Sequence, residues 1–192
     1  MDALLVSTLA VAIAEIGDKT QLLALVLAAR YRKPWPIVAG IFAATVLNHA
    51  LAGWLGALVS GWVDPDWLRW GVVLSFLAVA AWALVPDKLD EDEAKAPRFG
   101  PFLATLVAFF LVEMGDKTQI ATVMLAAQYP HFILVVIGTT LGMLIANVPV
   151  VLAGNFAAER LPLTLIRRLA ACAFAALAVY AGYQALKFSG FI

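Results

Sequence analysis

Two charged heptapeptides lie inside apolar segments of this chain. Residues 15–21 read EIGDKTQ and residues 113–119 read EMGDKTQ, and each lies in a run of otherwise apolar residues long enough to cross a bilayer. A charged side chain near the bilayer centre costs roughly 2.5–3.5 kcal/mol on insertion scales. The chain is therefore limited to folds in which both heptapeptides face protein or an internal polar site instead of lipid.

The composition indicates a helical membrane protein. Of the 192 residues, 64% are hydrophobic and 14% are charged, which is too apolar for a soluble domain. The formal net charge is zero, so we expect no nucleic-acid partner. The first apolar segment lacks a basic region before it, and we therefore expect a retained helix and not a cleaved signal peptide.

Six apolar segments have the length that a bilayer demands. They cover about residues 3–29, 35–59, 68–85, 102–127, 132–156 and 163–186. A polar segment rich in Asp and Glu separates the third from the fourth. We predict an all-α integral membrane protein with a three-helix repeat at residues 1–86, an acidic linker at 87–100 and a second three-helix repeat at 101–192.

The internal repeat is longer than the heptapeptide. A shift of 98 positions aligns Glu15 with Glu113 and Tyr31 with Tyr129, and ten of the seventeen residues from 15 to 31 are identical to their partners. Three crossings per half make the second half enter the membrane in the opposite sense. The sequence thus predicts six transmembrane helices arranged as two inverted repeats, with the substrate site near the midplane where the halves meet.

The distribution of lysine and arginine predicts the orientation. Nine of these residues lie on the side of the loops after the first, third and fifth segments, either in those loops or near the start of the sixth segment, and two lie on the other side. The positive-inside rule places the nine in the cytoplasm, together with the acidic linker, and both termini outside.

The spacing of charges in each heptapeptide suggests a shared function. On a continuous helix, residues three and four apart project from one face. The charged residues concerned are Glu15, Asp18 and Lys19 in the first copy and Glu113, Asp116 and Lys117 in the second. One alternative is that each Glu and Lys form a purely structural ion pair. The glycine between Glu and Asp allows either an unwound turn or a close approach of the two halves.

Convergence of the two copies would create a cation site. Four carboxylates and two ammonium groups sum to −4 + 2 = −2, the charge that one divalent cation balances. Oxygen ligands without thiolates suit Ca²⁺, Mg²⁺ and Mn²⁺, and the reluctance of Mg²⁺ to dehydrate favours Mn²⁺ and Ca²⁺. Crowded carboxylates in a low dielectric take up protons when no metal is bound, and metal binding releases them. Proton-coupled antiport is the natural hypothesis.

The duplicated E-x-G-D-K-[ST] motif resembles that of a known transporter family. Both copies are intact, and the resemblance to the divalent-cation family of transmembrane protein 165, Golgi manganese/calcium–proton antiporters and bacterial manganese exporters covers nearly the whole chain. It implies cation binding by Glu15, Asp18, Glu113 and Asp116. No targeting extension precedes the first segment, which suggests a bacterial inner-membrane member, and for these the resemblance favours Mn²⁺ export over Ca²⁺ transport.

Other polar residues are expected to have supporting roles. The set comprises Lys19, Thr20, Gln21, Asn48, Lys117, Thr118, Gln119 and Asn147. The two asparagines either bring amide oxygens to the site or form interhelical hydrogen bonds. His49 could relay protons, but packing or hydrogen bonding is the preferred interpretation. Gly138 and Gly142 have a G-x-x-x-G spacing that predicts close helix packing.

The preferred hypothesis is therefore a secondary transporter, not an enzyme, that exports Mn²⁺ in exchange for protons. Its partners would be the bilayer and the divalent cation, and no cofactor is expected. A Ca²⁺/proton antiporter of the same architecture and a passive divalent-cation channel are the alternatives. An intramembrane aspartyl protease with an Asp18/Asp116 dyad is a weaker one, because it would not need the accompanying Glu and Lys residues.

Overall fold

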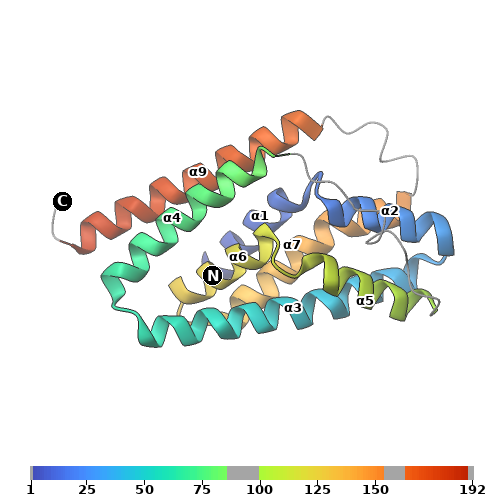
Figure 1. Ribbon diagram of the computed structural model, residues 1–192, viewed down its shortest axis with the longest axis horizontal. Helices are drawn as coiled ribbons and strands as arrows, with labels where there is room; N and C mark the ends of the chain where they lie inside the picture. The colour runs from blue at the N-terminus through green and yellow to red at the C-terminus, as the bar shows by residue number, and fades with distance from the viewer. Residues whose placement is uncertain (1, 86–99, 154–162, 190–192) are drawn as a thin grey trace.

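The computed structural model describes residues 2–85, 100–153 and 163–189, and these fold almost entirely into helices (Figure 1). The predicted acidic linker falls almost entirely outside the described residues. The helices are α1 (Asp2–Glu15), α2 (Lys19–Tyr31), α3 (Pro34–Trp62), α4 (Pro65–Ala83), α5 (Pro101–Glu113), α6 (Lys117–Gln128), α7 (Phe132–Ala153) and α9 (Leu163–Phe188). The described part of the chain contains no strand, so the predicted all-α class is confirmed.

Local sequence explains where several helices begin. α3, α4 and α5 each begin with a proline, whose missing N–H and fixed φ suit the first helical position. α2 begins after Asp18, which caps the helix by accepting a hydrogen bond from the backbone N–H of Thr20 at 3.2 Å. Helix boundaries therefore follow ordinary capping chemistry, including at the first heptapeptide.

Among the described residues, four helices are long and apolar enough to cross a membrane: α3, α4, α7 and most of α9. The predicted first and fourth segments are not continuous helices. Each is broken at its heptapeptide into two shorter helices, α1 with α2 and α5 with α6. The expectation that Glu, Asp and Lys of each heptapeptide project from one face of a continuous helix is therefore wrong, because the break lies between the Glu and the Asp.

The motif glycines explain the breaks. Gly17 has φ = +83° and Gly115 has φ = +78°, a left-handed conformation that residues with a side chain rarely adopt. A Cβ atom added to Gly115 would meet nothing within 4 Å, so close packing does not require a glycine there. Of the two interpretations of this glycine, the structure supports the unwound turn.

Close helix contacts recur in the two halves of the chain at positions 98 residues apart. A Cβ on Gly40 of α3 would lie 2.7 Å from the carbonyl oxygen of Phe102 in α5, and one on Gly138 of α7 would lie 2.6 Å from that of Leu4 in α1. A Cβ on Gly142 would lie 2.6 Å from the carbonyl oxygen of Thr8. The predicted close packing of the G-x-x-x-G segment is thus confirmed: α1 packs on α7 as α5 packs on α3.

α4 and α9 lie side by side at one side of the bundle and pack against α6 and α1 (Figure 1). Their central contact joins Phe76 and Phe174, which are also 98 positions apart, with ring centroids 6.1 Å from each other. Large apolar side chains such as Leu74 and Val179 point outward and are exposed, as expected for helices that face lipid. The heptapeptides lie instead within the bundle formed by α1–α3 and α5–α7.

Candidate metal centre

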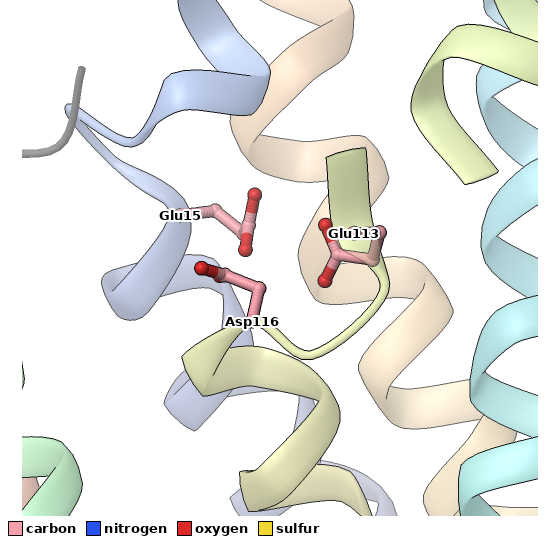
Figure 2. Close-up of side chains that lie close together, drawn as sticks. All are labelled: Glu15, Glu113 and Asp116. Carbon is pink, nitrogen blue, oxygen red and sulfur yellow. The ribbon is translucent and has the colours of Figure 1, made fainter. Parts of the chain in front are cut away.

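Three motif carboxylates from the two halves lie together inside the bundle. Glu15, Glu113 and Asp116 each offer an oxygen within 4.8 Å of the others, and they are 0%, 2% and 2% exposed. Figure 2 shows that Glu15 reaches the cluster from the end of α1, while Glu113 and Asp116 approach it from the two sides of the break between α5 and α6. The breaks in the helices thus allow acids on both sides of a turn to meet.

A threonine holds each glutamate in place. Thr20 donates its hydroxyl to Glu15 Oε2 at 2.5 Å, and Thr118 donates its hydroxyl to Glu113 Oε1. The second oxygens, Glu15 Oε1 and Glu113 Oε2, are buried and accept no hydrogen bond from any described residue. Buried oxygens without a donor are costly, which is the condition expected of carboxylates whose partner is a cation or a proton.

A glutamine closes each turn in the same way. Gln21 Oε1 accepts the backbone N–H of Gly17 at 2.8 Å, and Gln119 Oε1 accepts that of Gly115 at 2.7 Å. The amide nitrogen of each glutamine then bonds across to the opposite half. Gln21 donates to the carbonyl oxygen of Ala146 at 2.8 Å, and Gln119 donates to Asn48 Oδ1 at 2.5 Å. These residues therefore fix the turns to the long helices α3 and α7.

Asp18 does not join the three-carboxylate cluster. It caps α2, and its Oδ1 accepts a hydrogen bond from the Nζ of Lys117, a buried ion pair between the two halves. Asp116 occupies the equivalent position in α6 but makes no capping hydrogen bond, and its carboxylate lies in the cluster. Three of the four predicted ligands are thus together, while the fourth is held by a lysine. This pairing also argues against an Asp18/Asp116 protease dyad.

The motif lysines pair with aspartates. Lys117 Nζ lies 3.9 Å from Asp116 Oδ2 in addition to its bond to Asp18, and Lys19 Nζ lies 4.0 Å from Asp116 Oδ1. Pairing of each lysine with the glutamate four residues before it would require a continuous helix, which the turn interrupts. The two cross-half pairs are unequal, because the side chain of Lys117 is 3% exposed and that of Lys19 is 18% exposed.

The two predicted asparagines have different surroundings. Asn48 forms interhelical hydrogen bonds, accepting from Gln119 and donating to the carbonyl oxygen of Phe110 at 3.2 Å. Asn147 donates within its own helix to the carbonyl oxygen of Met143 at 3.1 Å, and its Oδ1 is buried without a hydrogen-bond donor among the described residues. The asparagines are one position out of register in the repeat, which explains why their contacts differ.

His49 is the residue whose surroundings the sequence interpretation missed. It is 0% exposed, and its Nε2 lies 3.8 Å from Glu113 Oε1. Packing and hydrogen bonding were the expected roles: the ring is fully buried, but neither ring nitrogen has a hydrogen-bond partner in the described part of the chain. A signal existed in the sequence: a shift of 98 aligns His49 with Asn147, so both halves place a polar side chain at this position.

The acids of the cluster are shielded from solvent in the described part of the chain. One cavity of about 450 Å³ lies near Arg69, Tyr129 and Tyr180, and another of about 370 Å³ lies near Arg32 and Lys33. No motif acid lines either cavity. The site is therefore a buried set of carboxylates suited to a hard cation, occluded in this conformation.

Fold and site together define a helical integral membrane protein with a buried acidic centre. The family model for the divalent cation/proton antiporter GDT1 matches residues 3–91 and 101–188. A Vibrio cholerae protein named "Putative manganese exporter" is 57% identical over 180 residues, covering 93% of this chain and 90% of its own length. The chain therefore belongs to the GDT1 family of divalent cation/proton antiporters.

More distant relatives carry the same family name. The Synechocystis GDT1-like protein sll0615 is 31% identical over 172 residues, covering 80% of this chain and 83% of its own length. The rice GDT1-like protein 4 is 27% identical over 186 residues, covering 83% of this chain and 66% of its own length. No solved structure matches the chain.

Proposed function

We propose that this protein is a secondary transporter that moves Mn²⁺ out of the cytoplasm in exchange for protons. The observation that carries the proposal is the convergence of Glu15 with Glu113 and Asp116, three buried carboxylates from both halves of the chain, within 4.8 Å of one another. Membership of an antiporter family supports the coupling to protons, and the name of the Vibrio relative supports the choice of ion.

The proposed architecture is six membrane crossings in two inverted repeats, residues 1–86 and 101–192, joined by a linker at 87–100. Helices α1 and α2 contain 14 and 13 residues, so each is about 20 Å long and too short for a hydrocarbon core of about 30 Å. Together they form one crossing with its break near the midplane, and α5 with α6 form another. Broken helices at the midplane are typical of binding sites in secondary transporters.

The repeated contacts support the inverted arrangement. α1 packs on α7 as α5 packs on α3, and Phe76 contacts Phe174, its own equivalent in the repeat. Contacts between equivalent residues are expected where a pseudo-two-fold axis relates the halves. The family model also matches two separate stretches, residues 3–91 and 101–188, which overlap the two proposed repeats.

Charge balance gives the coupling mechanism. The cation ligands must be ionised, so Mn²⁺ binding displaces protons from the carboxylates, and proton binding on the other side of the membrane displaces Mn²⁺. Two protons for each divalent ion keep the charge of the buried site constant. Because the chain buries these acids away from lipid and solvent, a site that is empty of both cation and protons is disfavoured.

The unequal lysine–aspartate pairs suggest how access alternates. Lys117 holds Asp18 while Lys19 lies 4.0 Å from Asp116, although the two pairs are equivalent in the repeat. In an inverted-repeat transporter the halves exchange conformations between the two states. We therefore expect the pairs to exchange roles, so that Asp18 is released from Lys117 and becomes the fourth carboxylate ligand in part of the cycle.

The proposed location is a bacterial inner membrane, with both termini outside. The excess of Lys and Arg in the loops after the first, third and fifth crossings supports this orientation. The two half-helix ends of each broken crossing would then face the same buried site from opposite sides of the membrane.

Purified protein in proteoliposomes tests the proposal. With an imposed pH gradient, we expect Mn²⁺ to accumulate against its own gradient in wild type, and not in Glu15→Gln or Asp116→Asn. Asp66→Asn is the matched control, because Asp66 is an exposed carboxylate outside the cluster. Mn²⁺ movement that ignores the pH gradient would indicate a channel, and preferential Ca²⁺ accumulation would indicate the Ca²⁺/proton alternative.

A further inference from the structure

His49 is an unexplained polar side chain inside the bundle. The residue is 0% exposed, and both Nδ1 and Nε2 lack a hydrogen-bond partner among the described residues. Leaving a buried polar group without a hydrogen-bond partner is costly, and native proteins rarely do so. A purely structural histidine would be expected to bond at least one ring nitrogen to the backbone or to a neighbouring side chain.

The imidazole lies beside one acid of the cluster, Glu113. His49 Nε2 lies 3.8 Å from Glu113 Oε1, which is too long for a hydrogen bond. Two ligands of one metal ion, each with a bond of about 2.0–2.2 Å, can lie up to about 4.4 Å apart. The 3.8 Å separation therefore fits a pair of donor atoms that share a cation better than it fits a hydrogen-bonded pair.

The internal repeat gives independent support for a ligand at this position. The residue equivalent to His49 is Asn147, on α7, and its Oδ1 is likewise buried without a donor among the described residues. Asn48, one position away, instead uses its amide in interhelical hydrogen bonds. Both halves thus place a buried polar atom that lacks a hydrogen-bond partner among the described residues at the same position of the helix next to the broken crossing.

We propose that His49 is a nitrogen ligand of the transported cation and that it determines selectivity against Ca²⁺ and Mg²⁺. The inference rests on the proposed function and adds a specificity-determining residue to the carboxylate site. Ca²⁺ and Mg²⁺ are hard ions that take oxygen ligands, whereas first-row transition ions also accept imidazole. A neutral imidazole adds this preference without changing the charge of the site.

The selectivity that His49 provides does not extend to every competing cation. Imidazole strengthens the binding of later transition ions such as Zn²⁺ at least as much as that of Mn²⁺. His49 is therefore expected to separate Mn²⁺ from the alkaline-earth ions and not from other transition metals.

Pulsed electron paramagnetic resonance of Mn²⁺ bound to the purified protein tests the inference directly. A coordinated imidazole gives ¹⁴N modulation, which should be present in wild type and absent in His49→Asn, a change that installs the residue found at the equivalent position of the other half. His131→Asn is the matched control, because His131 is the second of the two histidines and is exposed. It should retain the nitrogen signal.

Competition binding gives the second readout. We expect His49→Asn to weaken Mn²⁺ binding by 10-fold or more, on the scale of effects seen when metal-site partners are removed, while Ca²⁺ binding changes little. Wild-type protein that binds Mn²⁺ without nitrogen modulation would overturn the role of His49 and leave the carboxylate site intact. Failure of wild type to bind Mn²⁺ at all would overturn both. The wild-type spectrum needs no variant, so a misfolded variant does not prevent the test.

Discussion

Substitution of the motif glycine in the second half tests the broken helix. Gly115 has φ = +78°, and a Cβ there would meet no atom within 4 Å. Gly115→Ala therefore adds backbone strain without a steric clash, and a left-handed conformation costs a residue with a Cβ about 1–2 kcal/mol. We expect the variant to be destabilised by that amount.

Gly71 is the matched control because it offers the same free space for a Cβ on a helical backbone. It lies inside α4, and its added Cβ would also meet nothing within 4 Å. Gly71→Ala should stabilise the protein by about 0.8–1.0 kcal/mol, since glycine is a poorer helix former than alanine. The two alanine variants should thus differ by about 2–3 kcal/mol, or about 4–12 °C in Tm for a chain of this size.

Thermal unfolding in detergent, followed by far-ultraviolet circular dichroism, measures this difference. Gly115→Ala should unfold below wild type and Gly71→Ala at or above it. If both substitutions raised Tm equally, Gly115 would lie in a continuous helix. That result would contradict the broken helix on which the carboxylate cluster depends.

Three further predictions follow from buried charges, close packing and proton linkage. Lys117→Gln should destabilise the protein by about 3–5 kcal/mol because it breaks the buried ion pair with Asp18. Lys19→Gln should cost less because the side chain of Lys19 is 18% exposed, and equal shifts in Tm would contradict this. Gly138→Ala should cost about 1–3 kcal/mol, since the added methyl would lie 2.6 Å from the carbonyl oxygen of Leu4, and an unchanged Tm would refute that packing. Mn²⁺ binding should weaken as pH falls and should release protons. Calorimetry in buffers of different ionisation enthalpy measures the number of protons released. Binding without proton release would argue against coupling through the carboxylates.

The helical class and most helix positions could be predicted from the sequence, because apolar length and prolines at helix starts are local signals. The breaks at Gly17 and Gly115 could not. Glycine inside a helix costs only about 1 kcal/mol relative to alanine, so an isolated glycine is compatible with a continuous helix or with a turn. The capping role of Asp18 was the available sign of a helix start, and the apolar residues on both sides obscured it.

The sequence identified the motif acids of the candidate site but not which charged residues form ion pairs with one another. Spacing along the chain identified the motif acids, but it did not reveal that Lys117 holds Asp18 of the other half, because that contact depends on how the halves pack. The position of His49 beside Glu113 was hidden for a related reason: its equivalent in the repeat is an asparagine, so a search for identical residues overlooks the pair. Six crossings, orientation and the ligand set remain predictions.

The most direct test of a single site shared by the two halves is equilibrium Mn²⁺ binding to the purified protein. We predict one Mn²⁺ per chain in wild type and in Asp66→Asn, and loss of that ion in both Glu15→Gln and Glu113→Gln, since each half supplies part of the same cluster. Two ions per chain, with one retained when either glutamate is replaced, would mean that each half binds its own cation and would contradict the shared centre.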